Sequence, residues 1–143
     1  MLKEFLKDNI KVIESVSTWE EALKIGAKLL VDNHNIEERY IKSIIDNVYK
    51  NGPYIVITDG VAMPHSRPEE GVLRKGMSLL KVKNGVDFYK TDKKVYLFFT
   101  LAAEDSLSHQ DAIAELADFL GDDDKLNKLM KEDLTKEEII NIF

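Results

Sequence analysis

Hydrophobic residues recur at three- and four-residue steps in the first third of the chain, as they do along one face of an α-helix. The first such stripe consists of Trp19, Ala22, Leu23, Gly26, Leu29 and Leu30. Thr18 and Glu21 have the spacing of a capping box, so we expect Thr18 to be the N-cap of this helix and Glu21 to bond back to it. A second stripe consists of Tyr40, Ile41, Ile44, Ile45 and Val48. It predicts a helix that begins near residue 36 and ends at the Asn-Gly-Pro sequence of residues 51–53.

The middle of the chain contains short apolar runs rich in β-branched residues. Residues 54–58, 77–82 and 95–101 each predict a strand, and we expect the first to be buried. The Asp-Gly pair at residues 59–60 is a turn signal, and the polar segments 83–85 and 90–94 predict two further turns.

Helical periodicity returns in the last third. A helix is expected to open at residues 108–111, and Gly121 can end it. Its apolar face would consist of Ile113, Leu116, Ala117 and Leu120. Short helices are expected at 124–131 and 135–143, and the acidic run 122–124 suits a solvated helix start. Helices at both ends and strands between them predict an α/β fold with a mixed β-sheet sandwiched by helices.

Composition narrows the functional classes. The chain has 143 residues, which fits one domain, and the absence of cysteine excludes disulfides, thiolate zinc sites and a cysteine nucleophile. A formal charge of −6 argues against nucleic acid as a partner. No apolar run approaches the roughly 20 residues of a membrane span, so we expect no membrane insertion. Charged residues near the N-terminus do not suit a secretory signal, which makes the cytoplasm the expected location.

His65 has the most distinctive setting of the three histidines. It follows Pro64, which interrupts ladder pairing and places the histidine at the edge or mouth of the sheet. Ser66 and Arg67 come next, before a second proline. A hydroxyl, a fixed cation and an imidazole on a stiffened loop suit an oxyanion such as phosphate. The alternative is an ordinary loop histidine.

The other two histidines also have two interpretations. His109 lies in the first turn of a predicted helix, where free N–H groups favour anions, and Ser106 and Ser108 add hydroxyl donors. It is otherwise an exposed residue after a capping serine. If the fold brings it to His65, one ring can take a phosphoryl group while the other donates to the phosphoryl oxygens. His34 lies in a polar link between helices and is expected to face solvent.

Other chemistries have little support. No pair of histidines has metal-ligand spacing, although a structural metal site of two histidines and a carboxylate remains a further alternative. The sequence contains no Gly-x-Ser-x-Gly motif, Walker loop or dinucleotide fingerprint.

The hexapeptide GVAMPH at residues 60–65 resembles the phosphorylation-site signature of enzyme IIA domains of the mannitol–fructose class. These domains belong to the bacterial sugar phosphotransferase system. Residues 52–57, 63–71 and 101–109 resemble in particular its ascorbate-type branch. The predicted helices on either side also fall where the family has them, so the resemblance covers nearly all of residues 1–143 as one enzyme IIA type-2 domain.

The resemblance implies a phosphoryl carrier with an α/β sandwich fold. His65 would accept a phosphoryl group from the phosphohistidine of HPr and pass it to a cysteine of enzyme IIB. Enzyme IIB in turn feeds the membrane permease, enzyme IIC. His109 would support the phosphoryl group, and Ser66, Arg67 and Ser108 would contribute phosphate contacts. No nucleotide or other cofactor is needed, because the phosphoryl group arrives on a protein.

One departure from the family bears on the substrate. Mannitol- and fructose-type members commonly carry an Arg-Glu pair and a threonine shortly before the signature, and residues 51–58 offer no evident counterpart of that arginine. Its absence favours L-ascorbate or a related carbohydrate, and Arg67 is a candidate replacement. A regulatory protein of the same fold, phosphorylated but not coupled to transport, is the alternative function. We expect an apolar docking rim at His65, with Met63 and Val61 as candidates, although Val61 also suits the core.

Overall fold

The computed structural model describes residues 2–143, with all side chains except those of residues 106, 108 and 109. The described residues form a mixed five-stranded sheet in the order β1-β4-β5-β3-β2. The strands are β1 (Ile10–Ile13), β2 (Val56–Thr58), β3 (Val61–Ala62), β4 (Gly76–Asp87) and β5 (Lys94–Ala102). The pairs β1–β4 and β3–β5 are parallel, and the other two neighbouring pairs are antiparallel.

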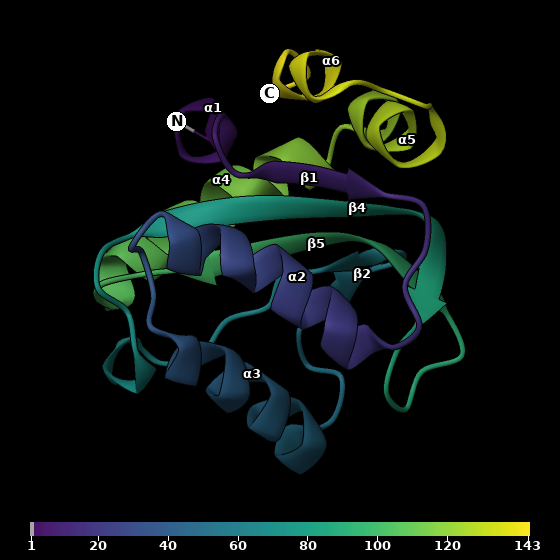
Figure 1. Cartoon of the computed structure of the whole chain (residues 1–143). Coiled ribbons are helices and arrows are strands. Elements are labelled where there is room, and N and C mark those ends of the chain that lie inside the picture. The colour runs from purple at the N-terminus through teal and green to yellow at the C-terminus, as the bar shows by residue number, and fades with distance from the viewer. Residues whose placement is uncertain (1) are drawn as a thin grey trace.

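Helices cover both faces of this sheet (Figure 1). One face carries α2 (Trp19–Asp32), with α3 (Glu38–Asn51) packed beside it. The other carries α1 (Leu2–Leu6), α4 (Ser106–Leu120), α5 (Asp123–Lys131) and α6 (Lys136–Ile140). A single 3₁₀ turn, η1 (Pro68–Glu70), follows the loop that contains His65. The predicted mixed sheet sandwiched by helices is therefore confirmed.

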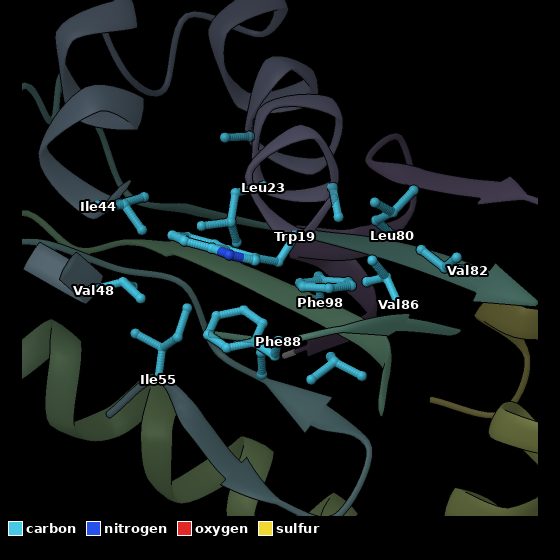
Figure 2. Packing of buried hydrophobic residues seen from close by; sticks show 14 of the residues in the cluster. Trp19, Leu23, Ile44, Val48, Ile55, Leu80, Val82, Val86, Phe88 and Phe98 are labelled. Carbon is cyan, nitrogen blue, oxygen red and sulfur yellow. The ribbon is translucent and has the colours of Figure 1, made fainter. Parts of the chain in front are cut away.

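Two hydrophobic cores explain the continuous apolar run in β5. Leu97 and Phe99 face the α1–α4–α5–α6 layer, whereas Phe98 and Ala102 between and beyond them face α2 and α3. Figure 2 shows the second of these cores, in which Trp19 of α2 lies over the sheet near Phe98. A strand buried on both faces needs apolar residues on both sides, and β5 has them from Val95 to Ala102 except at Thr100.

Helix caps agree with the sequence pattern. The Thr18 hydroxyl accepts from the Glu21 N–H at 3.2 Å, as predicted, although no return bond from the Glu21 carboxylate occurs among the described side chains. Asp122 caps α5 by accepting from the Lys125 N–H at 3.1 Å, which confirms the solvated helix start.

Several boundaries differ from the prediction. Residues 83–85 do not form a turn, because β4 continues through them with a shifted register and Gly85 at a φ of 68°. The strand expected at residues 54–58 is shorter and is not buried: β2 is an edge strand, and Ile57 is 42% exposed. The helix expected from residue 108 begins at Ser106. None of the helices in the described part of the chain combines the length and the apolar character needed to cross a bilayer.

Candidate functional site

The loop that carries His65 is fixed to its neighbours by backbone hydrogen bonds. It begins where β3 ends, at Ala62. The Met63 N–H donates to the Ile55 carbonyl at 2.7 Å, and the Pro64 carbonyl accepts from the Leu101 N–H at 2.9 Å. Pro64 interrupts regular pairing here, as predicted, and these two bonds hold the segment between β5 and the residue that precedes β2.

The imidazole of His65 is oriented by its own loop. Its Nδ1 lies 2.7 Å from the Met63 carbonyl oxygen. A carbonyl oxygen only accepts, so Nδ1 carries the proton and the lone pair of the neutral ring is on Nε2. The Tyr54 ring packs edge-on against the imidazole, with centroids 5.6 Å apart and an interplanar angle of 79°.

The peptide bond between His65 and Ser66 is bound at both ends by tyrosine hydroxyls. The Tyr54 hydroxyl donates to the His65 carbonyl at 3.1 Å, and the Ser66 N–H donates to the Tyr40 hydroxyl at 2.9 Å. Tyr40 is fully buried, and this burial raises the pKa of its phenol to about 12. Both bonds therefore fix the backbone at the position of the histidine.

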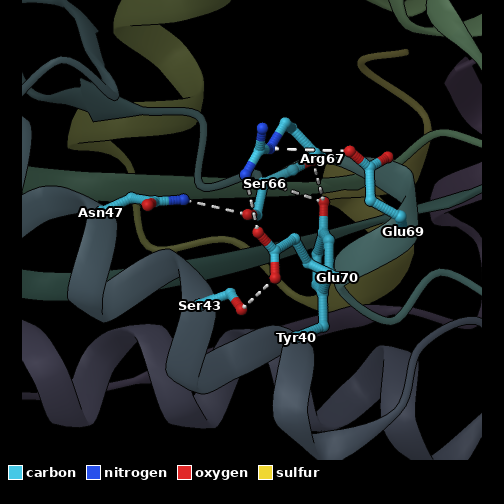
Figure 3. A network of polar contacts seen from close by, with 7 residues as sticks. All are labelled: Tyr40, Ser43, Asn47, Ser66, Arg67, Glu69 and Glu70. Carbon is cyan, nitrogen blue, oxygen red and sulfur yellow. Dashed lines mark hydrogen bonds and ion pairs between the residues drawn. The ribbon is translucent and has the colours of Figure 1, made fainter.

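Ser66 is predicted to bind phosphate and is buried in the structure. Its hydroxyl accepts from the Asn47 amide of α3 at 3.0 Å (Figure 3). A hydroxyl that accepts one bond still has a proton to donate, so this contact leaves Ser66 able to donate to an anion.

Arg67 is the other predicted phosphate contact beside His65, and its side chain is 75% exposed. Its guanidinium lies 3.2 Å from a Glu70 carboxylate oxygen and 3.7 Å from one of Glu69 (Figure 3). The Ser43 hydroxyl donates to the other Glu70 oxygen at 3.1 Å. An anion would compete with these two carboxylates for the guanidinium.

His65, Ser66 and Arg67 line an open cleft of about 610 Å³. Its walls are formed by Asn47, Lys50, Asn51, Tyr54, His65, Ser66, Arg67, Pro68, Asp105 and Gln110. A hollow of the same volume runs along β1 but contains no histidine. The structure thus brings His65, Ser66 and Arg67 together, and Lys50 adds a second cation to the cleft.

The second predicted histidine belongs to the first turn of α4. The side chains of His109 and Ser108 are outside the described residues, so their predicted roles stay predictions. The backbone of α4 nevertheless places them between Asp105 and Gln110, both of which line the cleft. His34 is exposed in the link between α2 and α3, as expected.

One prediction about the apolar rim needs correction. Met63 is 3% exposed and packs in the core with Val61, because both point into the layer beneath α4. Met63 is therefore not a docking residue, and Val61 has the core role given as its alternative. The exposed apolar side chains near the cleft are those of Tyr54 and Leu107.

The contribution of α3 to the cleft was not predicted. Tyr40 was expected only as part of an apolar stripe, yet its hydroxyl reaches the His65 loop. Ser43, Asn47 and Lys50 follow it at three- and four-residue steps. Such spacing places polar side chains on one side of a helix, so the signal was present in the sequence beside the apolar stripe.

The chain matches the family model described as "Phosphoenolpyruvate-dependent sugar phosphotransferase system, EIIA 2" over residues 4–143. It belongs to this family. Enzyme IIA components of this system are phosphotransferases that relay a phosphoryl group through a histidine. Among the described residues, no three histidine or carboxylate side chains lie close enough together to hold a metal ion.

Individual relatives agree with this assignment. The mannitol-specific cryptic phosphotransferase enzyme IIA component of Escherichia coli K12 is 40% identical over 88% of this chain and 86% of its own. The ascorbate-specific EIIA component of the same strain is 37% identical over 99% of this chain and 94% of its own. The solution structure of the cryptic mannitol-specific enzyme IIA CmtB from Escherichia coli superposes with a TM-score of 0.89. It is 35% identical and covers 99% of this chain and 96% of that one.

Proposed function

We propose that His65 is the phosphoryl acceptor and that its Nε2 takes the group from phosphorylated HPr. The observation that carries this proposal is the contact between Nδ1 and the Met63 carbonyl, which leaves the lone pair of the neutral ring on Nε2. His65 lies at the wall of the cleft, and its ring orientation is fixed before the donor arrives. Such preorganisation lowers the barrier to an in-line transfer.

The proposed transfer is balanced in both steps. Nε2 attacks the phosphorus, the N–P bond of the donor breaks, and its electron pair returns to the HPr histidine. The His65 ring gains positive charge and retains its Nδ1 proton, which the Met63 carbonyl stabilises. In the second step a cysteine thiolate of enzyme IIB attacks the phosphorus, and the electron pair of the broken N–P bond neutralises the His65 ring.

The cleft offers groups that suit the phosphoryl oxygens. Lys50 and Arg67 supply positive charge, and Ser66 supplies a hydroxyl. The first turn of α4, which follows Asp105, supplies backbone N–H groups that have no acceptor within the helix itself. We propose that His109 and Ser108 complete this set from α4. His109→Ala is then expected to slow phosphorylation while leaving measurable labelling.

We propose that this carrier works in the cytoplasm and serves the uptake of L-ascorbate or a related carbohydrate. The ascorbate-specific relative aligns over nearly the whole chain, and the 52–57, 63–71 and 101–109 segments resemble that branch. The mannitol-type relative is slightly more identical to this chain, but over a shorter alignment. The branch is therefore to be determined by which type of enzyme IIB accepts the phosphoryl group.

Phosphorylation of the purified chain tests the acceptor. Enzyme I, HPr and phosphoenolpyruvate are expected to add one phosphoryl group to the wild type and none to His65→Ala. His34→Asn is the matched control, because His34 is exposed at a φ of 60° that asparagine tolerates. Full labelling of His65→Ala would exclude His65 as the acceptor.

Transfer to enzyme IIB tests the pathway and the branch. The phosphorylated chain is mixed with an ascorbate-type or a mannitol-type enzyme IIB, and loss of its label is followed over time. We expect faster transfer to the ascorbate-type protein. A stable label in the presence of both would favour the regulatory alternative, and faster transfer to the mannitol-type protein would refute the ascorbate proposal.

A further inference from the structure

Two tyrosines from different parts of the chain hold the same peptide bond, the one that follows His65. Tyr40 comes from the first turns of α3 and binds the Ser66 N–H at 2.9 Å. Tyr54 comes from the segment before β2 and binds the His65 carbonyl at 3.1 Å. The two hydroxyls therefore form hydrogen bonds at opposite ends of the same peptide group, which is rigid because a peptide bond is planar.

Tyr40 also connects the His65 loop to the sheet. Its hydroxyl lies 2.8 Å from the Leu101 carbonyl and 3.1 Å from the Ser66 carbonyl, so its single proton can serve either acceptor. Leu101 is the second-last residue of β5, and the chain continues from there to Asp105 and α4. One buried hydroxyl thus joins both segments that border the cleft.

Tyr54 acts on the ring as well as on the backbone. Its phenol contacts the imidazole edge-on, and its hydroxyl binds the carbonyl of the same histidine. A Tyr54→Phe variant keeps the ring contact and removes the hydroxyl, with its bond to the His65 carbonyl and its interaction with Asn47. Because Tyr54 is 40% exposed, this change leaves the core intact.

We infer that Tyr40 and Tyr54 are positioning residues that clamp the His65–Ser66 peptide and so aim Nε2 of His65 into the cleft. The inference rests on the proposed role of His65 as phosphoryl acceptor. The ring is joined to this backbone through a single carbon, Cβ, so the position of the backbone limits where the ring can lie. Its Nδ1 reaches the Met63 carbonyl from the clamped position. Small displacements of a reacting group reduce transfer rates strongly.

Kinetics with phosphorylated HPr as the donor test the clamp. We expect Tyr40→Phe and Tyr54→Phe each to lower kcat by about 10-fold, with KM within about twofold of the wild type. Both changes act on one peptide, so the double variant is expected to lose less than the product of the two single effects. Tyr49→Phe is the matched control, because the Tyr49 hydroxyl bonds Glu20 and does not line the cleft.

The ring nitrogens of His65 provide a readout that general destabilisation does not move. In ¹⁵N NMR spectra of the folded wild type, we expect the neutral ring to carry its proton on Nδ1. The folded Tyr40→Phe and Tyr54→Phe proteins are expected to shift toward protonation on Nε2, because the Nδ1 contact is no longer enforced. If Tyr40→Phe does not fold, the kcat and the ring-nitrogen shifts of Tyr54→Phe alone test the clamp.

Three outcomes would overturn the clamp. The first is a wild-type kcat and unchanged ring-nitrogen shifts in Tyr40→Phe and Tyr54→Phe. The second is an equal loss of kcat in the control, Tyr49→Phe. The third is a rise in KM at unchanged kcat in Tyr54→Phe, which would assign Tyr54 to HPr docking. Labelling of His65→Ala is a separate result, since it would refute the proposed acceptor and not the geometry of the clamp.

Discussion

The buried hydroxyl of Tyr40 makes a definite prediction for stability. In Tyr40→Phe the Ser66 N–H loses its acceptor inside the protein, and the Leu101 carbonyl loses a donor. An unsatisfied buried polar group costs about 1–3 kcal/mol. We therefore expect the variant to unfold with a free energy about 1–3 kcal/mol below that of the wild type at pH 8.

The same group gives this difference a pH dependence. Burial raises the pKa of Tyr40 from 10.0 to about 12, so the folded state keeps the phenol proton after the unfolded state has lost it. The stabilisation that comes from the protonated Tyr40 phenol is complete below pH 10. Between pH 10 and pH 12 it falls by about 1.4 kcal/mol per pH unit. By pH 11 the advantage of the wild type over Tyr40→Phe should have fallen by roughly 1.4 kcal/mol.

Urea unfolding of both proteins at pH 8, 9, 10 and 11, followed by far-UV circular dichroism, measures this difference directly. Comparing two proteins at each pH removes the contribution of every other tyrosine and lysine, which they share. A difference that stays constant from pH 8 to 11 would refute the assignment of a buried, protonated hydroxyl to Tyr40.

Two further predictions concern the sheet, and urea unfolding at pH 7 tests both. Gly85→Ala should lower the free energy of unfolding by about 2–4 kcal/mol, because the residue has a φ of 68° and a Cβ there would lie 2.7 Å from the Tyr96 ring. An unchanged free energy of unfolding in Gly85→Ala would contradict the clash. Thr100→Val should gain about 1 kcal/mol, because the Thr100 hydroxyl is buried without a hydrogen-bond partner among the described residues; a loss would show that it has one.

Periodicity was sufficient to predict the layers of the fold. The stripes that begin at Trp19 and Tyr40 form α2 and α3, and the central apolar runs form β4 and β5. These elements are long enough to show a period. By contrast, α1 and β1 contain five and four residues, and β1 acquires its role only by pairing with β4, almost 70 residues away in the chain. Contacts of that kind leave no local pattern.

The turn signal at residues 83–85 correctly indicated a backbone conformation typical of turns, but it wrongly predicted that the strand ends there. The Lys-Asn-Gly segment does contain a glycine with positive φ, as a turn would. Val86 nevertheless pairs with Val95 beyond it, so Gly85 is an irregularity within β4. In the same way Ile57 has the composition of a core residue, but its strand lies at the edge of the sheet.

The site was predicted where its residues are adjacent in sequence and missed where they are not. His65, Ser66 and Arg67 stand together in one segment, and the family signature marks it. Tyr40 and Tyr54 reach that segment from α3 and from the turn before β2. A tyrosine in an apolar stripe packs its ring into the core, and the bond its hydroxyl makes depends on which loop lies above it.

The nitrogen that carries the phosphoryl group tests the central claim most directly. Uniformly ¹⁵N-labelled protein is phosphorylated with enzyme I, HPr and phosphoenolpyruvate, and the coupling between ³¹P and the imidazole nitrogens is recorded by NMR. We expect one phosphate, on Nε2 of His65, because Nδ1 is bound to the Met63 carbonyl. A phosphate on Nδ1 of His65, or on any other residue, would contradict the account.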